Sequence, residues 1–254
     1  MKKMRILAAV PLALVFLSGG AWAADLSMGP AAAPMARPPV TALLFTGLNV
    51  GVQGGGGWAS SNTCVQSNDI PPYDYGCAPF DPGYNTINMS GPYIGGHIGY
   101  DFAISPAWRL GVEGDFNWAG ITGKGEQYWS YSGVGAYVNE KIDSFGTLNA
   151  RVGYVMGNWM PYVTGGLAFG HGTRDSVEEF NNFVLGSSSG SASHTGWDIG
   201  AGVEWAINQH WSVKAEYKYI DLGRANYHLD DSIDTVLGIA AKVQTAEFGV
   251  SYRF

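Results

Sequence analysis

Long runs in which apolar and polar residues alternate restrict the fold of this chain more than any other feature. The run WSVKAEYKYIDLG (211–223) has apolar side chains at every second position: Trp211, Val213, Ala215, Tyr217 and Tyr219. The residues between them are polar: Ser212, Lys214, Glu216 and Lys218. Because successive side chains of a strand point to opposite faces, this pattern predicts a strand with one apolar and one polar face.

Similar alternation recurs along the chain and predicts eight strands. Clear runs cover 94–104, 108–118, 197–207 and 246–254, and weaker ones cover 45–58, 142–156 and 160–171. At about 12 residues, the predicted strands are longer than the five or six residues usual in soluble sheets. At ~3.4 Å per residue and ~40° tilt, such a strand rises roughly 30 Å, enough for the ~25 Å apolar band of an outer-membrane barrel.

The predicted connections alternate between short and long. Short turns are expected at 105–107, 157–158 and 208–210, and long loops at 59–90, 121–140, 173–194 and 224–241. Short turns at one end and long loops at the other are typical of transmembrane barrels.

Seven of the nine tryptophans mark the ends of these predicted strands. Four lie near the short turns: Trp108, Trp159, Trp205 and Trp211. Three lie toward the long loops: Trp58, Trp118 and Trp197. Two aromatic girdles at the membrane interfaces would place them so. We therefore predict an all-β fold, an eight-stranded antiparallel up-and-down transmembrane β-barrel over residues 43–254.

The first 42 residues are expected to lie outside the barrel. Basic residues, an apolar stretch over 6–17 and the small-x-small triplet ending at Ala23 predict a signal peptide over 1–23. The apolar stretch is shorter than the ~20 residues of a spanning helix. Residues 24–42 are rich in Ala and Pro and predict a flexible periplasmic tail. Cleavage would leave eleven Lys and Arg against 21 Asp and Glu, a balance that argues against a nucleic-acid partner.

Four quoted segments carry a family resemblance: LFTGLNVGVQGGGGW (44–58), GGHIGYDFAISPAWRLGVEGDFNW (95–118), WSVKAEYKYIDLG and the terminal FGVSYRF. They resemble the small outer-membrane porin-like proteins of alphaproteobacteria, the Omp25/Omp31 type, and more broadly the OmpA-like and opacity-protein-like eight-stranded barrels. The chain departs from the family at Leu48, where members often carry an aromatic residue, and in its long first loop with two cysteines. The resemblance implies an outer-membrane location.

The same resemblance implies insertion by the barrel-assembly machinery, which in this family recognises a last strand that ends in an aromatic residue. The residues that match this signal are Phe248, Val250, Tyr252 and Phe254. Because the last strand must pair with the first to remove both sheet edges, Phe254 is expected at the periplasmic rim, facing lipid.

The polar faces of the predicted strands carry charges of both signs. Seven acids are expected inside: Asp101, Glu113, Asp115, Asp198, Glu204, Glu216 and Glu247. Five bases accompany them: Arg109, Arg151, Lys214, Lys218 and Arg253. Side chains fill the interior of an eight-stranded barrel, and buried charges need partners. We therefore predict a lumen closed by ion pairs.

The short turns fix a register for these predicted pairs. Turn 208–210 sets Glu204 opposite Lys214, and Asp198 diagonal to Lys218. Turn 105–107 sets His97 opposite Asp115 by the same rule. These six residues are the expected lumen pairs.

Two cysteines fall in the first predicted loop. Cys64 and Cys77 are expected to form a disulfide, because an exported chain is exposed to an oxidising compartment. Metal binding with Asp69 or Asp74 is the alternative, although the spacing is a poor zinc pattern. The glycine-rich GVQGGGGW (51–58) lacks the Gly-Lys-Ser/Thr ending of a phosphate-binding loop and is typical of a curved barrel strand.

The sequence predicts a mainly structural envelope protein with surface-exposed loops. No catalytic, cofactor or metal residue is predicted, and the expected partners are outer-membrane lipid and lipopolysaccharide. The alternatives are a small diffusion channel, a lipid-modifying enzyme that uses His97 with the inward carboxylates, and an adhesin. The acidic residues of the loops also suggest a weaker role in holding divalent cations.

Overall fold

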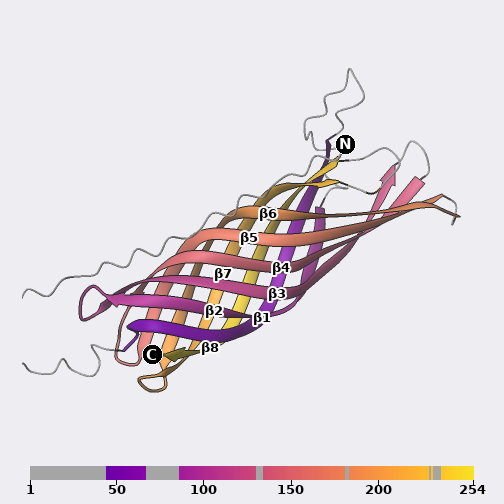
Figure 1. Cartoon of the computed structure of the whole chain (residues 1–254). Coiled ribbons are helices and arrows are strands. Elements are labelled where there is room, and N and C mark those ends of the chain that lie inside the picture. Colours follow the sequence, from indigo (N-terminus) through magenta and orange to yellow (C-terminus); the bar gives the residue numbers. More distant parts are fainter. Residues whose placement is uncertain (1–43, 67–85, 130–133, 181–182, 229, 231–235) are drawn as a thin grey trace, which may run out of the picture. The chain divides into compact units, whose positions relative to one another are not determined.

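Eight antiparallel strands form a closed barrel in chain order (Figure 1). The computed structural model describes residues 44–66, 86–129, 134–180, 183–228, 230 and 236–254. The strands are β1 (Gly47–Gln66), β2 (Thr86–Ala103), β3 (Trp108–Trp129), β4 (Val134–Tyr154), β5 (Trp159–Phe180), β6 (Phe183–Ala206), β7 (Trp211–His228) and β8 (Val236–Arg253). Pairing of β1 with β8, as at Val52 and Val250, closes the sheet. Within the described ranges, no helix is long and apolar enough to cross a membrane.

The strands are longer than the sequence pattern predicts. They run from 18 residues in β2 to 24 in β6. The prediction of a long loop at 173–194 is wrong, because β5 and β6 leave only residues 181–182 between them. Much of the other predicted long loops is also strand. The outer face of these extensions is polar, as in the serine-rich part of β6, so apolar and polar residues no longer alternate there.

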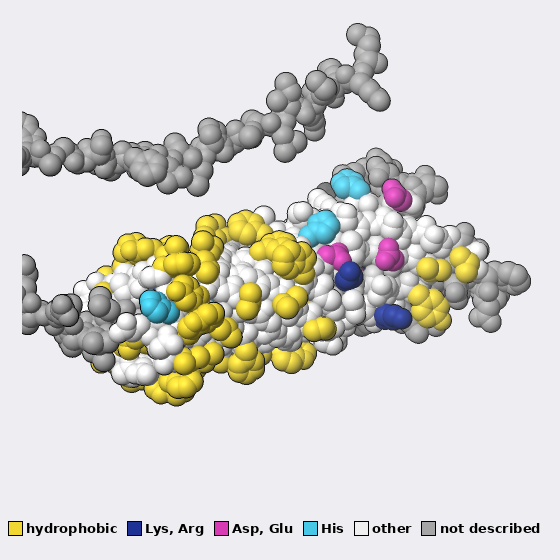
Figure 2. All heavy atoms as spheres, turned by 60° about the horizontal axis from the view of Figure 1, so that its bottom comes forward, with side chains coloured by type: hydrophobic (Ala, Val, Ile, Leu, Met, Phe, Trp, Pro, Cys, Tyr) yellow, Lys and Arg dark blue, Asp and Glu magenta, His cyan; other side chains and the backbone are white. Residues whose placement is uncertain are grey.

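An apolar surface surrounds the half of the barrel that carries the short turns. The seven girdle tryptophans are all 39–65% exposed. Near the short turns their rings contact other aromatic rings: Trp159 lies 5.9 Å from Trp205, and Trp211 lies 5.1 Å from Tyr252, between centroids. Figure 2 shows most apolar side chains gathered on one half of the barrel and the Lys, Arg, Asp and Glu side chains on the other, with histidine side chains on both. This band fits the hydrocarbon layer, and the strands continue beyond it.

Beyond the apolar band, the barrel wall divides into two four-stranded sheets. Pairing of β6 with β7 stops at Trp197 and Asp221, and pairing of β2 with β3 stops at Ser90 and Thr122. The sheets β7–β8–β1–β2 and β3–β4–β5–β6 remain paired farther out. In Figure 1 the β5–β6 hairpin extends away from the tips of β7 and β8.

Glycine allows the last close contact between β6 and β7. A Cβ on Gly196 would lie 1.8 Å from the carbonyl oxygen of Asp221, so no larger residue fits there. On β7, two residues after Asp221, Gly223 adopts a φ of 65° beside a bulge between Asp221 and Arg224. This left-handed conformation is open to glycine at little cost, and the bulge bends β7 away from its neighbour.

The inside of the barrel is layered, which the sequence pattern does not predict. At the short-turn end an apolar cluster contains Leu44, Phe45, Met160 and Ala206. Charged side chains fill the next level. Farther out lies a larger apolar layer whose members include Tyr93, Ile121, Phe145, Ile220 and Val243. The prediction of a polar interior therefore holds for only part of the lumen. In the outer apolar layer the facing sheets lie close enough to pack their apolar side chains against each other.

Candidate functional site: the charged lumen

The charged residues of the lumen lie on the inward positions of six strands. These positions alternate with outward-facing residues that are mostly apolar, as Lys214 does with the half-buried Val213 and Ala215. The charged side chains are almost fully buried: Asp101, Glu113, Arg151, Glu204, Glu216, Lys214, Lys218, Glu247 and Arg253 are 1–6% exposed. Charges buried to this degree destabilise a fold unless they are paired.

Arg151 on β4 joins three carboxylates from three other strands. Its Nε lies 3.3 Å from Asp101 Oδ1, and its Nη1 donates to Glu113 Oε2 at 3.1 Å. Its Nη2 donates to Glu204 Oε2. The guanidinium carbon lies 4.4 Å from the centroid of the Tyr162 ring. A planar group with five N–H donors suits such a position, because it can bind several oxygens at once.

Arg253 completes this network on the side nearest the short turns. It lies near the end of β8, and its Nη2 is 3.3 Å from Asp101 Oδ2 and 3.1 Å from Glu204 Oε1. Asp101 and Glu204 therefore each bind both Arg151 and Arg253. Because the last strand contributes Arg253, the network connects the end of the chain to the centre of the barrel.

Two lysines extend the network toward the outer apolar layer. Lys214 Nζ lies 2.8 Å from Glu113 Oε1 and 3.6 Å from Glu247 Oε1. Lys218 Nζ lies 2.8 Å from Asp115 Oδ2 and 3.2 Å from Glu216 Oε1. The ion pairs thus connect β2, β3, β4, β6, β7 and β8 across the lumen.

The turn register places the predicted residues opposite each other, but their ion pairs are formed elsewhere. Glu204 pairs in the ladder with Lys214, and His97 with Asp115. Lys218 pairs with Gly200, which sets Asp198 on the diagonal.

The side chains instead point across the lumen. Glu204 binds arginines of β4 and β8, and Lys214 binds carboxylates of β3 and β8. The expected Glu204–Lys214 and Asp198–Lys218 ion pairs are corrected accordingly. In a narrow barrel a long side chain can pass the residue opposite it in the ladder and reach either the far wall, as Lys214 does to Glu113, or a diagonal position on a neighbouring strand, as it does to Glu247.

His97 and Asp198 form hydrogen bonds with neutral side chains. His97 Nδ1 lies 2.9 Å from Gln53 Oε1, and its Nε2 lies 2.9 Å from Ser251 Oγ. Asp198 accepts a hydrogen bond from Asn149 Nδ2 at 2.9 Å. The expected His97–Asp115 pair is therefore also corrected. His97 and Ser251 are 5% and 3% exposed, so a hydrolytic role would have to bring a substrate into a filled lumen.

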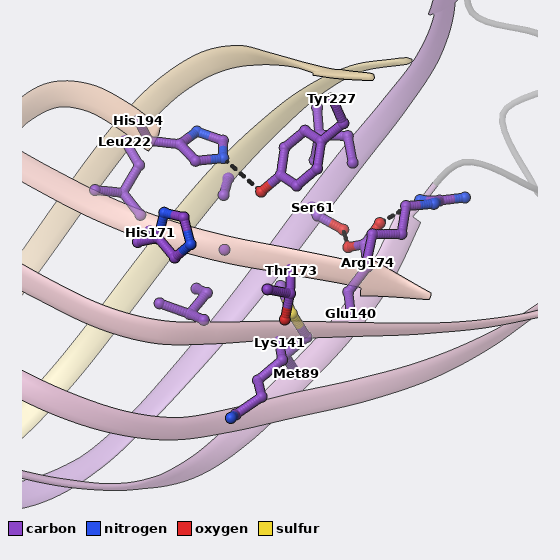
Figure 3. A pocket seen from close by; sticks show the side chains of 14 residues that line it. Ser61, Met89, Glu140, Lys141, His171, Thr173, Arg174, His194, Leu222 and Tyr227 are labelled. Atoms are coloured by element: carbon purple, nitrogen blue, oxygen red, sulfur yellow. Dashed lines mark hydrogen bonds and ion pairs between the residues drawn. The ribbon is translucent and has the colours of Figure 1, made fainter. Parts of the chain in front are cut away.

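A second charged cluster lies beyond the apolar layer and was missed by the sequence analysis (Figure 3). Glu140 on β4 accepts hydrogen bonds from Ser61 and Arg174, and Arg174 also donates to Thr63 Oγ1 at 3.0 Å. These contacts join β1 to β4 and β5, and so connect the two outer sheets. Glu140 and Arg174 fall in segments predicted as loops, where inward and outward positions were not assigned.

His194 and Tyr227 make a similar connection across the separated β6 and β7. His194 Nε2 lies 2.9 Å from Tyr227 Oη. Both side chains line a cavity of about 20 Å³, together with Glu140 and Arg174. A cavity of this size holds about one water molecule. Among the described residues, no group of three His, Cys, Asp or Glu side chains is arranged to hold a metal ion.

Apolar residues separate the two charged clusters and close the short-turn end. The rings of Tyr93 and Phe145 meet edge to face with centroids 5.0 Å apart, and Ile121 and Val243 are fully buried between the clusters. At the other end, Arg109 donates to the carbonyl oxygens of Leu44 at 3.1 Å and Ser105 at 2.9 Å. A solute that crossed the lumen would have to displace both the apolar layers and the charged clusters.

Other predicted residues lie at the ends of the chain or outside the described ranges. Phe248, Val250 and Phe254 are exposed on β8 and at its end, and the Tyr252 ring contacts the Trp211 and Phe254 rings. Cys77 and the side chain of Cys64 lie outside the described residues, so the disulfide stays a prediction. The signal peptide over 1–23 and the tail over 24–42 also lie outside them.

The family model and the sequence relatives both match outer-membrane proteins. The model of the outer membrane protein β-barrel domain matches residues 14–254. The 31 kDa outer-membrane immunogenic protein of Brucella melitensis is 32% identical over 243 residues, which cover 92% of this chain and 93% of that protein. The 25 kDa outer-membrane immunogenic protein of the same species is 28% identical over the full length of both. The crystal structure of the outer membrane protein OprG from Pseudomonas aeruginosa aligns with 12% identity and a TM-score of 0.45, over 82% of this chain and 97% of that one.

Replacing Arg151 with Met is expected to destabilise the barrel by about 3–5 kcal/mol, because three buried carboxylates lose a shared cation. Urea unfolding of the refolded protein in lipid vesicles, followed by tryptophan fluorescence, measures this change. Lys141→Met is the control, since Lys141 pairs with Asp143 on the surface and should contribute at most about 1 kcal/mol. Equal losses in the two variants would contradict a special role for the buried network.

Proposed function

The chain belongs to the outer membrane protein β-barrel family, of the Omp25/Omp31 type, and on this premise we propose a mainly structural role in the cell envelope. It is an outer-membrane protein. In the proposed role the barrel fills and stabilises the membrane and carries its long outer strands at the cell surface.

The filled lumen is the observation that carries this proposal. Arg151, Arg253, Lys214 and Lys218 are each held by two or three carboxylates, and apolar clusters lie on both sides of this network. An ion that crossed the barrel would have to separate several buried pairs, and leaving a buried charge without its partner costs several kcal/mol. These contacts therefore favour a closed, structural barrel over a conducting pore.

A small diffusion channel is the second candidate. The charged residues of the lumen favour it, because polar side chains that rearranged together would leave a hydrated path. The Tyr93–Phe145 contact opposes such a path, since water gains nothing from entering an apolar layer. The two candidates therefore differ in one measurable property, steady ion flow.

Single-channel recording of the refolded wild-type barrel in a planar bilayer is expected to give no steady conductance steps. The double variant Tyr93→Ala/Phe145→Ala, which removes both rings of the apolar layer, serves as the matched control and should conduct more often. A large, steady conductance in the wild-type protein would contradict the structural role and favour the channel.

We also propose the barrel-assembly machinery as a partner during insertion. The proposal is supported by the aromatic side chains on the outer face of β8, with Phe248 73% and Phe254 69% exposed. Phe248 lies on β8, which must pair with β1 to close the barrel, and Phe254 directly follows that strand, so a factor bound there would control closure.

Phe254→Ser should slow insertion into vesicles that contain the assembly machinery and leave unassisted refolding into detergent unchanged. Trp205→Ser is the control, because Trp205 is an exposed aromatic residue on β6, away from the last strand. Comparable slowing by both variants would mean that surface aromatic content, not the end of β8, determines the rate.

A further inference from the structure

Beyond the apolar band, one edge of β6 is left without a neighbouring strand. The ladder of β6 with β7 stops at Trp197, so among the described residues the stretch from Phe183 to Gly196 forms a ladder only with β5. In Figure 1 this stretch lies in the hairpin that extends away from the tips of β7 and β8. A free strand edge presents backbone N–H and C=O groups that can pair with another chain.

Every second residue of this stretch directs its backbone groups to the free edge. The carbonyl oxygen of Ser189 points there, because it accepts a hydrogen bond of 3.0 Å from the backbone N–H of Asp230, which lies between β7 and β8. The carbonyl oxygen of Thr195 faces the same way, since a Cβ on Gly223 of β7 would lie 2.7 Å from it. In an antiparallel sheet such groups recur at alternate positions, and the β5–β6 register is regular over this stretch. The other residues with this direction are Ser187, Ser191 and Ser193.

The β6 edge lacks the features that usually prevent strand addition. Natural sheet edges are commonly short, charged, interrupted by proline or bent by a bulge. The corresponding edge of β7 carries Arg224 beside a bulge, and that of β3 carries Lys124 and Glu126. The β6 segment VLGSSSGSASHTG (184–196) contains no Lys, Arg, Asp, Glu or Pro. Its four serines at the alternate positions are exposed and small, so the backbone remains accessible to another chain.

The residues around this edge are acidic. The outer part of the hairpin, 175–196, contains three acidic residues and no Lys or Arg. Two exposed aspartates lie on either side of Ser189: Asp175 is its partner in the β5 ladder, and Asp230 donates its backbone N–H to the Ser189 carbonyl oxygen. A strand with lysine or arginine side chains would therefore be attracted to the edge, whereas a second copy of the same acidic hairpin would be repelled.

We propose that the free edge of β6 binds an extended, basic segment of another protein as an added strand. The backbone groups at the alternate serines form the ladder with this segment, and its basic side chains lie near Asp175 and Asp230. In such complexes main-chain hydrogen bonds give the affinity and side chains give the specificity. The bond from Asp230 to Ser189 shows that the edge accepts a backbone donor, and the bound segment replaces it. The inference goes beyond the structural role and does not depend on the closed lumen.

The test uses the full-length barrel refolded in micelles of a zwitterionic detergent. The probe is a synthetic peptide of alternating threonine and lysine, about ten residues long, which is the upper end of common strand lengths. Fluorescence anisotropy measures its affinity. Isotope-labelled peptide carbonyls separate its infrared amide band from that of the barrel, and this band should move to the frequency of a paired strand when the peptide binds.

Ser189→Pro/Ser191→Pro should bind the peptide roughly thirtyfold more weakly, because it removes two N–H donors and each net hydrogen bond contributes about a factor of five. These N–H groups point away from β5, so the β5–β6 ladder is retained, and proline is tolerated at such edge positions. Ser189→Ala/Ser191→Ala is the matched control. It removes the same hydroxyl groups and keeps both donors, and it should bind as the wild-type protein does.

Further arms test the backbone and charge requirements separately. The same peptide N-methylated at consecutive residues, and so blocked on both of its edges, should bind the wild-type barrel as weakly as the unmodified peptide binds the proline variant. Asp175→Asn should weaken binding roughly twofold to fivefold. Its control is Asp143→Asn, because Asp143 pairs with Lys141 on β4.

Three results would overturn the proposal. The first is unchanged binding by the proline variant, and the second is an equal loss in the alanine variant. The third is a dimer that forms without peptide and is abolished by the proline substitutions, because the edge would then serve a second copy of this chain.

Discussion

The ion pairs of Arg151 with Asp101, Glu113 and Glu204 are the interaction on which the rest of the barrel depends. They bring together β2, β3, β4 and β6 at a depth that water does not reach, and Arg253 adds β8 through the same two carboxylates, Asp101 and Glu204. Removal of the central cation would leave three buried carboxylates with one basic partner each, Arg253 or Lys214, and incompletely paired buried charge is costly. The network therefore specifies how opposite walls of the barrel meet.

The layers around this network follow from what surrounds the barrel. Inside the membrane the outer surface must be apolar, so the polar residues of each strand occupy the lumen and pair there. Beyond the membrane the outer surface faces a polar layer, and the inward positions can become apolar, as at Ile87 and Ile239. The wall then divides into two sheets that share an apolar core, with Glu140 and Arg174 connecting them. The closed lumen is thus a consequence of the alternation within the membrane.

Much of the fold could be predicted from single residues and their spacing. The alternation around Trp211 and the position of Phe254 predict strands, girdles and closure, and the short turns place Glu204 opposite Lys214. The actual partners of Lys214, Glu113 and Glu247, could not be predicted, because they depend on the stagger of the strands and on the reach of side chains inside the lumen. Glu140 and Arg174 could not be assigned to the lumen from the sequence, because their strands continue outside the membrane, where apolar and polar residues no longer alternate.

A double-mutant cycle tests the central claim most directly. Arg151→Met, Glu204→Gln and the combined variant, compared by unfolding in lipid vesicles, should show a coupling free energy of about 2 kcal/mol or more, because the two side chains share one buried contact. Arg151→Met combined with Glu140→Gln provides the reference, since the apolar layer separates these residues, and their effects should add to within about 0.5 kcal/mol. Additive effects in both cycles would contradict a barrel held together by its buried ion pairs.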